Sequence, residues 1–410
     1  MRIFKCRVVL AALAAVFAAS TARATPMYSL TTLVNFSSAN GTSPYGIATD
    51  GTGNLYTAMN QGGTNNAGTV VELTETTHVV MTLGTFGGTG NGVNPDSGVI
   101  SDANGNLYGT TVHGGALGFG AVFEVAAGTQ TITTLASFNN TNGANPIGAL
   151  IADSSGNLYG TTSGGANGNS NGTVFEVGAK THGITTLASF NNTNGNSPLS
   201  SLLVDANGNL YGTTSRGGAN NDGTVFKVAA GTHALSLLAS FSGTNGGGSL
   251  IADSSGNLYG TLEEGGANGD GSIFELNPTT GVFTTLFSFN GLDGYKPDGS
   301  LIADANGNLY GMTFGGGGDS GLAGTVFELN VTNNSLTTLF AFNSTDGRVP
   351  EGNLIADANG NLYGVTNQGG ANNDGTLFEL SPVPEPSSLV MSLAALSGAA
   401  VVIWTKKRHR

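Results

Sequence analysis

Short runs of β-branched and aromatic residues recur along most of the chain, and turn-forming residues separate them. One unit reads GALIAD at 148–153, NLYGTT at 157–162, GTVFEV at 172–177 and ITTLASF at 184–190. Short runs bounded by Gly, Asn and Asp are typical of β-strands. The DSSGN and DANGN sequences between the first two runs predict a tight hairpin, in which Asp caps the turn and Gly takes a positive φ. Each unit therefore predicts four short strands.

This unit recurs seven times. The leucine of the NLY run marks the repeats, at Leu55, Leu107, Leu158, Leu210, Leu258, Leu309 and Leu362. The intervals are 52, 51, 52, 48, 51 and 53 residues, which is the period of propeller blades and close to that of the kelch repeat. Four antiparallel strands per repeat indicate a β-propeller. An open β-solenoid is the alternative that the period alone leaves open.

The phase of the repeats favours a closed ring. LTTLVNF at 30–36 is a copy of the fourth run, and it precedes any first run, whereas the last repeat ends on its third run, GTLFEL at 375–380. Pairing these two segments would complete the last blade and remove an exposed sheet edge. We therefore predict an all-β fold over residues 25–380, a seven-bladed β-propeller with four-stranded blades that the N-terminal strand closes.

The beginning of the chain has the pattern of a secretory signal peptide over residues 1–24. A basic start precedes an apolar run from Val8 to Ala19, and Ala22 and Ala24 stand where a signal peptidase would cleave. The single cysteine, Cys6, would leave with this segment, so we expect a mature protein without disulfides.

The other end has the pattern of a membrane segment. Pro384, Glu385 and Pro386 lie in a predicted linker at 381–388, which two prolines would keep extended. The apolar run at 389–404 is long enough for a transmembrane helix across a thin bilayer. The basic tail at 405–410 would keep its own end on the cytoplasmic side.

Composition narrows the range of partners. The chain has 26 acidic and 13 basic residues and a net charge of −13. Between the two ends the basic residues are Lys180, Arg216, Lys227, Lys296 and Arg348. So acidic a domain lacks the basic surface that nucleic acid requires, and an anionic membrane surface would repel it.

The repeat and the tail each resemble a known pattern. The period GNLYGTT…GG…GTVFEV…TTLASF, over roughly residues 30–380, resembles the choice-of-anchor GloVer repeat proteins of bacteria, and the tail is similar to PEP-CTERM sorting signals. The second resemblance implies recognition of Pro384, Glu385 and Pro386 by an exosortase-type enzyme of a Gram-negative envelope. It also implies transient passage through the inner membrane and a final place at the cell surface or outside the cell. The strand followed by a glycine pair more distantly resembles the kelch blade. The repeats lack the kelch tryptophan, so this resemblance implies no partner.

The repeated positions offer no catalytic set. His78, His182 and His233 occupy the same turn of three different repeats, so a ring would spread them too far apart to cooperate. The DANGN hairpins lack the distal glutamate of a calcium loop, and Asp capping explains them without an ion. The GGANNDG loops could supply oxygen ligands to calcium, which leaves metal binding open, and we expect no other cofactor.

Differences between the repeats are a better guide to a ligand site, since structural positions must meet the same packing need seven times. The residues just before each glycine pair vary and lie where the second strand reaches the face of the long loops. The candidate ligand face contains Gln61, His113, Arg216, Glu263, Glu264, Phe314 and Gln368. Glu263 and Glu264 are adjacent, so they should point to opposite sides of a strand.

We therefore expect a secreted, surface-sorted protein that is not an enzyme and that acts as a binding or structural module of the cell surface or extracellular matrix. Its partners would be extracellular polysaccharide or a surface protein. One alternative is a propeller-type polysaccharide hydrolase or lyase using Glu263, Glu264 or His113, which would need a second acid/base group from another blade. The other is a calcium-dependent adhesin.

Overall fold

The computed structural model describes residues 27–383, apart from 76, 89, 166–170 and 318–322. The predicted signal peptide, the Pro384–Pro386 motif and the predicted transmembrane helix at 389–404 lie outside these residues. Within the described part of the chain, no helix combines the length and the apolar character that a membrane span needs.

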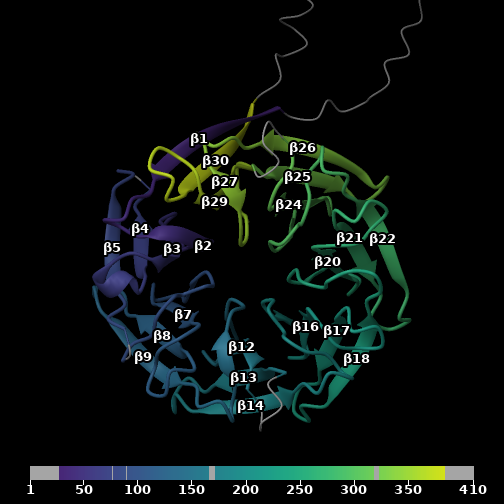
Figure 1. Ribbon diagram of the computed structural model, residues 1–410, viewed down its shortest axis with the longest axis horizontal. Coiled ribbons are helices and arrows are strands. Elements are labelled where there is room, and N and C mark those ends of the chain that lie inside the picture. Colours follow the sequence, from purple (N-terminus) through teal and green to yellow (C-terminus); the bar gives the residue numbers. More distant parts are fainter. Residues whose placement is uncertain (1–26, 76, 89, 166–170, 318–322, 384–410) are drawn as a thin grey trace, which may run out of the picture. The chain divides into compact units, whose positions relative to one another are not determined.

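Residues Tyr28–Val383 form one compact unit, in which the described strands make seven antiparallel sheets arranged as the blades of a ring (Figure 1). Blade 1 contains β2 (Thr42–Thr49), β3 (Leu55–Gln61), β4 (Thr69–Leu73) and β5 (Val80–Thr85), with a short 3-10 helix, η1 (Thr64–Asn66), after β3. Blade 2 contains β6 (Ile100–Ser101), β7 (Leu107–Thr111), β8 (Ala121–Val125) and β9 (Ile132–Ser137). Blade 3 contains β10 (Ala144–Pro146), β11 (Ile151–Ala152), β12 (Leu158–Gly164), β13 (Thr173–Val177) and β14 (Ile184–Ser189).

The remaining four blades repeat this order. Blade 4 contains β15 (Leu203–Val204), β16 (Leu210–Thr214), β17 (Thr224–Val228) and β18 (Leu235–Ser240). Blade 5 contains β19 (Ile251–Ala252), β20 (Leu258–Leu262), β21 (Ser272–Leu276) and β22 (Phe283–Ser288). Blade 6 contains β23 (Ile302–Ala303), β24 (Leu309–Thr313), β25 (Thr325–Asn330) and β26 (Ser335–Ala341). Blade 7 contains β27 (Arg348–Pro350), β28 (Ile355–Ala356), β29 (Leu362–Gln368), β30 (Thr376–Val383) and β1 (Met27–Asn35).

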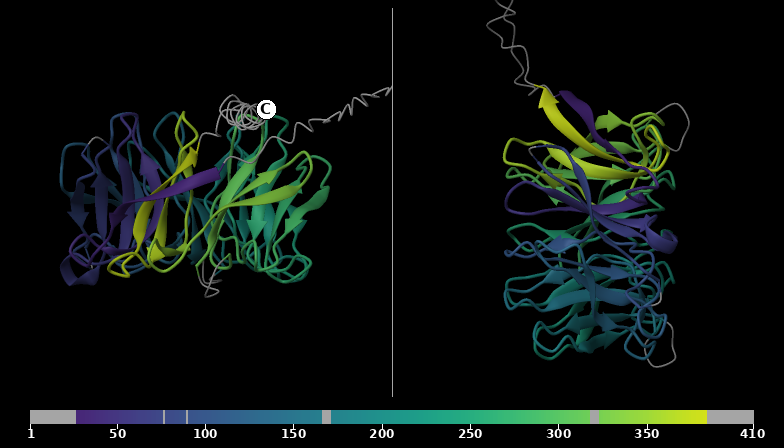
Figure 2. Two further views of the ribbon diagram at one scale, coloured as in Figure 1. Left: turned by 90° about the horizontal axis from the view of Figure 1, so that it is seen from above. Right: turned by 90° about the vertical axis from the view of Figure 1, so that its left-hand side faces the viewer.

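Each blade is a meander whose first strand lies nearest the axis and whose fourth strand lies at the rim (Figures 1 and 2). In blades 3 and 7 the innermost strand is divided into two pieces, which pair with the same neighbour. These findings confirm the seven-bladed propeller with four-stranded blades and exclude the solenoid. Strand β30 runs to Val383, three residues past the predicted end of the propeller at 380.

The N-terminal strand closes the ring, as the phase of the repeats predicts. Strand β1 pairs with β30 and becomes the outermost strand of blade 7. Just beyond it, the Phe36 N–H donates to the Gly375 carbonyl at 3.0 Å, and the Asn372 side chain donates to the Phe36 carbonyl at 2.8 Å. The first and last repeats are thereby joined by sheet hydrogen bonds.

Seven hydrophobic clusters of described residues fill the spaces between neighbouring blades. At six interfaces the Phe after the outer strand of one blade packs on the Phe in the third strand of the next. The pairs are Phe86–Phe123, Phe138–Phe175, Phe190–Phe226, Phe241–Phe274, Phe289–Phe327 and Phe342–Phe378, with ring centroids 4.9–5.7 Å apart. Tilted or edge-on pairs of this kind add about 0.5–1.5 kcal/mol each to the burial of the rings.

Short hairpins between the first and second strands share one face of the ring, called here the short-hairpin face. Asp102 shows how they are built: its carboxylate accepts hydrogen bonds from the backbone of Asn104 and Asn106 at 2.8 and 2.9 Å. It also accepts one from the Tyr108 hydroxyl at 3.2 Å. Although partial burial opposes them, these hydrogen bonds hold the pKa of Asp102 below its ordinary value. The predicted Asp-capped turn is confirmed.

Candidate functional site

A channel of about 600 Å³ lies at the centre of the ring, lined mainly by the innermost segment of every blade. At the end nearest the long loops, one equivalent position contributes a residue from each blade, directly after a proline in all blades except blade 5. In blade order these channel-ring residues are Tyr45, Asp96, Ile147, Leu199, Gly247, Asp298 and Glu351. The ring is therefore polar and acidic over blades 6, 7, 1 and 2, and apolar or bare over blades 3 to 5.

The inner segments around the channel are bonded to one another. The Asn353 side chain of blade 7 both accepts from the Ile47 N–H and donates to the Ile47 carbonyl, each at 2.9 Å. On the opposite side, the Ser201 hydroxyl accepts from the Ala149 N–H at 3.0 Å, and Ser249 accepts from the Ser201 N–H at 3.1 Å. Hydrogen bonds between blades hold the lining in place, so the site is preorganised.

Glu351 lies in a hydrogen-bonded group where blades 7 and 1 meet. Its carboxylate accepts from the Asn367 amide at 3.2 Å and from the Tyr45 hydroxyl. Burial, together with the nearby charges of Asp298 and Asp96, raises the pKa of Glu351 to about 7. Burial and the Glu351 charge also raise the pKa of Tyr45. Glu351 therefore changes its charge near neutral pH, whereas Tyr45 stays a neutral donor.

Asp96 of blade 2 extends the acidic arc. It accepts a hydrogen bond from the side-chain amide of Asn60, on the second strand of blade 1. Burial raises its pKa, and the Asn60 hydrogen bond and the nearby His113 partly offset that rise. His113 itself is exposed, and its Nδ1 lies 3.2 Å from the Asn145 amide nitrogen.

Glu263 and Asp298 form a carboxyl pair between blades 5 and 6. A side-chain hydrogen bond joins them when one of the two carries a proton. Burial raises the pKa of Glu263 to about 7. The protein that surrounds Asp298 also raises its pKa, although the Asp298 side chain keeps an exposed surface. Gly247 makes room for the pair, because a Cβ there would lie 2.7 Å from Oε1 of Glu263.

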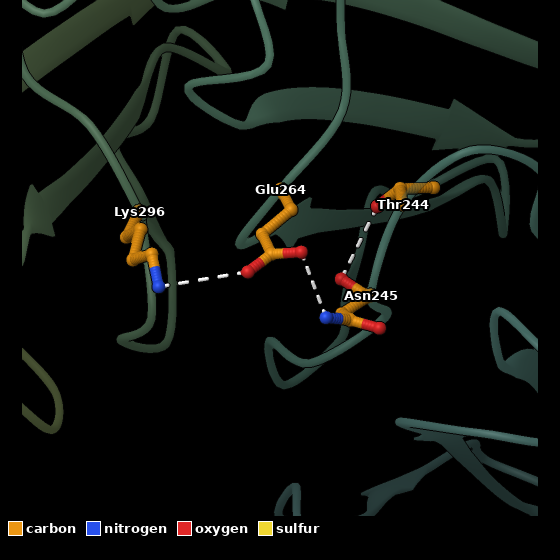
Figure 3. A network of polar contacts seen from close by, with 4 residues as sticks. All are labelled: Thr244, Asn245, Glu264 and Lys296. Carbon is orange, nitrogen blue, oxygen red and sulfur yellow. Dashed lines mark hydrogen bonds and ion pairs between the residues drawn. The ribbon is translucent and has the colours of Figure 1, made fainter.

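Glu264 belongs to a different network of polar contacts, which Figure 3 shows. Its Oε1 lies 3.5 Å from Lys296 Nζ, and its Oε2 accepts from the Asn245 amide at 2.8 Å. The Asn245 carbonyl in turn accepts from the Thr244 hydroxyl at 3.2 Å. Glu264 thus belongs to a partly exposed contact between the loops of blades 5 and 6, and only Glu263 of this dipeptide lines the channel.

The other predicted ligand-face residues do not line the channel. Gln61 and Gln368 extend the second strands of blades 1 and 7, where they pair with Thr42 and Arg348. Arg216 is exposed and its backbone pairs with Asn196. The Phe314 ring lies 6.4 Å from the Tyr295 ring, both centroid to centroid.

Sequence reasoning missed Tyr45, Asp96, Asp298 and Glu351. The signal was present, because the residue after the proline varies between repeats as strongly as the dipeptide that we compared. The same comparison applied to the fourth-to-first loops would have found all four. What it would not have shown is that Asp298 of one repeat contacts Glu263 of the previous one.

The remaining histidines of the described residues do not line the channel. His78, His182 and His233 lie in equivalent turns with φ near +50°, where they belong to three different blades. Among the residues described, no three His, Cys, Asp or Glu side chains are grouped as a metal site. The chemistry available in the channel is therefore hydrogen bonding, negative charge near neutral pH and apolar contact.

A family model for the Gloeobacter/Verrucomicrobia repeat matches residues 85–250 and 201–402. The search of curated proteins finds no match. Among solved structures, an oligogalacturonate lyase in complex with manganese is similar to this chain, with a TM-score of 0.58 and 13% identity over 88% of this chain and 95% of that one.

Two further solved structures are similar to the same extent. The oligogalacturonate lyase of Vibrio parahaemolyticus has a TM-score of 0.55 and 12% identity, over 87% of this chain and 94% of that one. The extracellular domain of BT4673 from B. thetaiotaomicron has a TM-score of 0.56 and 12% identity over 86% of this chain, which spans 39% of that structure. At such identities the likeness shows the propeller fold alone.

Proposed function

Since the chain belongs to the Gloeobacter/Verrucomicrobia repeat family, whose model matches most of it, we propose that it is a binding module of the cell exterior. Its ligand would enter the axial channel from the face of the long loops. This proposal rests on the difference between the two sides of the channel ring. One side is acidic, with Asp298, Glu351 and Asp96, and the other is apolar, with Ile147 and Leu199. A position with only a structural role would repeat with the blades, as the interface phenylalanines do.

The proposal includes the place where the protein acts. The signal-peptide pattern at 1–24 and the Pro384–Glu385–Pro386 tail support export, transient insertion in the inner membrane and sorting by an exosortase-type enzyme to the surface or the extracellular matrix. The fold of an extracellular domain from another bacterium is similar, which agrees with an extracellular setting.

A carbohydrate-cleaving enzyme is the second candidate, because Glu263 has the partner from another blade that such an enzyme needs, Asp298. A carboxyl group that holds a proton near pH 7 could serve as a general acid. The four carboxyl groups of the channel would, however, repel an anionic chain such as oligogalacturonate. New reducing ends or unsaturated products appearing when the protein is mixed with envelope polysaccharide would favour the enzyme over the binding module.

A bulky substitution tests the channel as the binding site. Ile147 lines the channel, and Ile147→Trp should fill part of its volume. The purified native protein and this variant are each equilibrated with a filtered envelope extract, and retained small molecules and oligosaccharides are measured by mass spectrometry. We expect the native protein to retain compounds that the variant loses by about tenfold or more.

Val79→Trp is the matched control, because Val79 is 54% exposed in a turn that does not line the channel. It should retain what the native protein retains, and both variants should melt at the native temperature. Equal retention by all three proteins would refute the channel as the site.

A further inference from the structure

We propose that the ligand of the channel is a small amphipathic cation, an ammonium group on an apolar stem. The ammonium would lie between Asp298, Glu351 and Asp96, and the stem would lie against Ile147 and Leu199. This inference rests on the proposed function, because it names the ligand class of the same channel.

The first observation is a shortage of positive charge. Among the described residues, Lys296 is the cation that acts on Glu263 and Asp298, and it does not line the channel. Lys296 is 45% exposed and is already paired with Glu264. Buried like charges require a counter-charge or a proton. A bound ammonium would supply that charge.

The second observation is a buried hydroxyl without a partner. Thr261 is 1% exposed, and its Oγ1 has no hydrogen bond. It lies two residues before Glu263, and its Oγ1 faces Gly248 of the innermost segment, but Thr261 itself does not line the channel.

Blade 5 is exceptional in this respect. The equivalent threonines have partners: Thr110 pairs with the Ser97 hydroxyl at 3.1 Å and Thr213 with the Ser200 hydroxyl at 2.9 Å. Blade 5 has Gly248 where those blades have the serine. An ammonium donates up to three hydrogen bonds, so the channel carboxylates suit it as acceptors.

The third observation is the shape and the apolar side of the channel. A volume of about 600 Å³ is within the range of small-ligand sites. Ile147 and Leu199 supply apolar surface opposite the acidic arc, and Gly247 beside them leaves space instead of a side chain. An anion would meet four carboxyl groups, and a compact inorganic cation would leave the apolar side without contact.

The pH dependence of binding follows from the groups that face the two glutamates. Asp298, Lys296 and Glu264 act on Glu263, while Asp298, Tyr45 and Asp96 act on Glu351. Burial raises the pKa of both Glu263 and Glu351 to about 7, so these carboxyls are mostly ionised at pH 8 and mostly protonated at pH 6. The affinity for a cation should therefore fall about tenfold or more from pH 8 to pH 6.

Calorimetric titration of the purified protein with n-hexylammonium chloride, hexanol and sodium hexanoate at pH 8 tests the proposal. We expect saturable binding of hexylammonium, binding of hexanol at least about tenfold weaker, and none of hexanoate. Glu351→Gln and Asp298→Asn should each weaken hexylammonium binding about tenfold, which corresponds to the loss of one charged hydrogen bond. Both variants should melt no lower than the native protein, since Glu351→Gln removes a partly buried negative charge and Asp298→Asn changes an exposed side chain.

Glu75→Gln is the control, because Glu75 is exposed and does not line the channel. It should bind hexylammonium as the native protein does. Equal binding of hexylammonium by native protein and both channel variants, or no binding at pH 8, would overturn the proposal. If Ile147→Trp abolishes retention of compounds that are all neutral or anionic, the channel site stands and the cation inference alone fails.

Discussion

Thr57 and Val71 break a pairing that the other six blades keep. In those blades a glycine on the second strand lies opposite a phenylalanine on the third, as Gly160 does opposite Phe175. A Cβ on Gly160 would lie 2.7 Å from Phe175 Cζ, so the ring requires a glycine there. In blade 1 the second strand has the larger Thr57 in place of glycine, and the third strand has the smaller Val71 in place of phenylalanine. The Thr57 hydroxyl donates to the Gly46 carbonyl at 2.8 Å. The two positions are therefore coupled through packing.

A double-mutant cycle in blade 3 measures this coupling. We expect Gly160→Thr to destabilise the protein by about 1–3 kcal/mol through overpacking against Phe175, seen as a lower Tm. Phe175→Val should destabilise as well, because it removes a ring that is 4.9 Å from Phe138. The double variant has the Thr–Val pair of blade 1. Its loss of stability should be smaller than the sum of the losses of the two single variants by about 0.5–3 kcal/mol.

The reverse change in blade 1 is the control for this cycle. Thr57→Gly relieves no clash, so it should cost only about 1–2 kcal/mol, from backbone entropy and one lost hydrogen bond. Strict additivity in blade 3 would mean that the glycine is present for a reason other than the phenylalanine ring.

Among the strands, β1 has a role that no other strand shares, because it joins the two ends of the repeat array. Tyr28 and Leu30 pack on the cluster between blades 6 and 7, whereas Val34 and Phe36 belong to the cluster between blades 7 and 1. One strand thus supports two interfaces and covers the edge of β30.

Deleting residues 25–37 should destabilise the protein and promote association. The deletion removes two buried side chains, Val34 and Phe36, from the closing interface and exposes the β30 edge to other chains. Thermal denaturation should show a clearly lower Tm, and sedimentation should show species larger than a monomer.

Alanine at the exposed positions Ser29 and Thr31 is the matched control, since both point away from the clusters. This variant should keep the native Tm and the native sedimentation behaviour. If the deleted protein also does so, the ring does not depend on its closing strand.

At the scale of the whole molecule, the two faces of the ring have different roles. The short-hairpin face repeats one polar arrangement of Asp, Asn and Tyr from blade to blade, as Asp102 and Asp205 illustrate. The long-loop face varies, and it holds the channel mouth with Glu263 and Glu351. A propeller displayed outside a cell would therefore bind its ligand through the variable face.

The proposed sorting of the whole protein predicts a change of location when the tail motif is removed. Replacing Pro384, Glu385 and Pro386 with alanine should leave full-length protein in the inner membrane, while the native protein reaches the surface or the medium. Cell fractionation followed by immunoblotting measures this.

Alanine at the neighbouring Ser387 and Ser388 is the control, and this variant should be sorted like the native protein. If the native protein and the motif variant both remain full-length in the membrane, the motif is only a linker before an anchor.

The repeat sequence by itself determined the blade count, the four strands and the closure. Each of these follows from local rules applied seven times: β-branched runs form strands, Asp-Gly turns form hairpins, and the split repeat pairs its two ends. The strands around Leu158 and the hairpin at Asp102 lie where those rules place them. Local rules were sufficient to predict these features, because each blade repeats the same contacts.

Only the tertiary structure decided which residues share the channel. Glu263 and Asp298 are 35 positions apart, and Glu351 and Tyr45 come from opposite ends of the repeat array, yet closure of the ring makes each a contacting pair. Their charge near neutral pH depends on burial and on neighbours from other blades, which no single repeat contains. The candidate site therefore belongs to the ring, while the strands that carry it belong to the repeat.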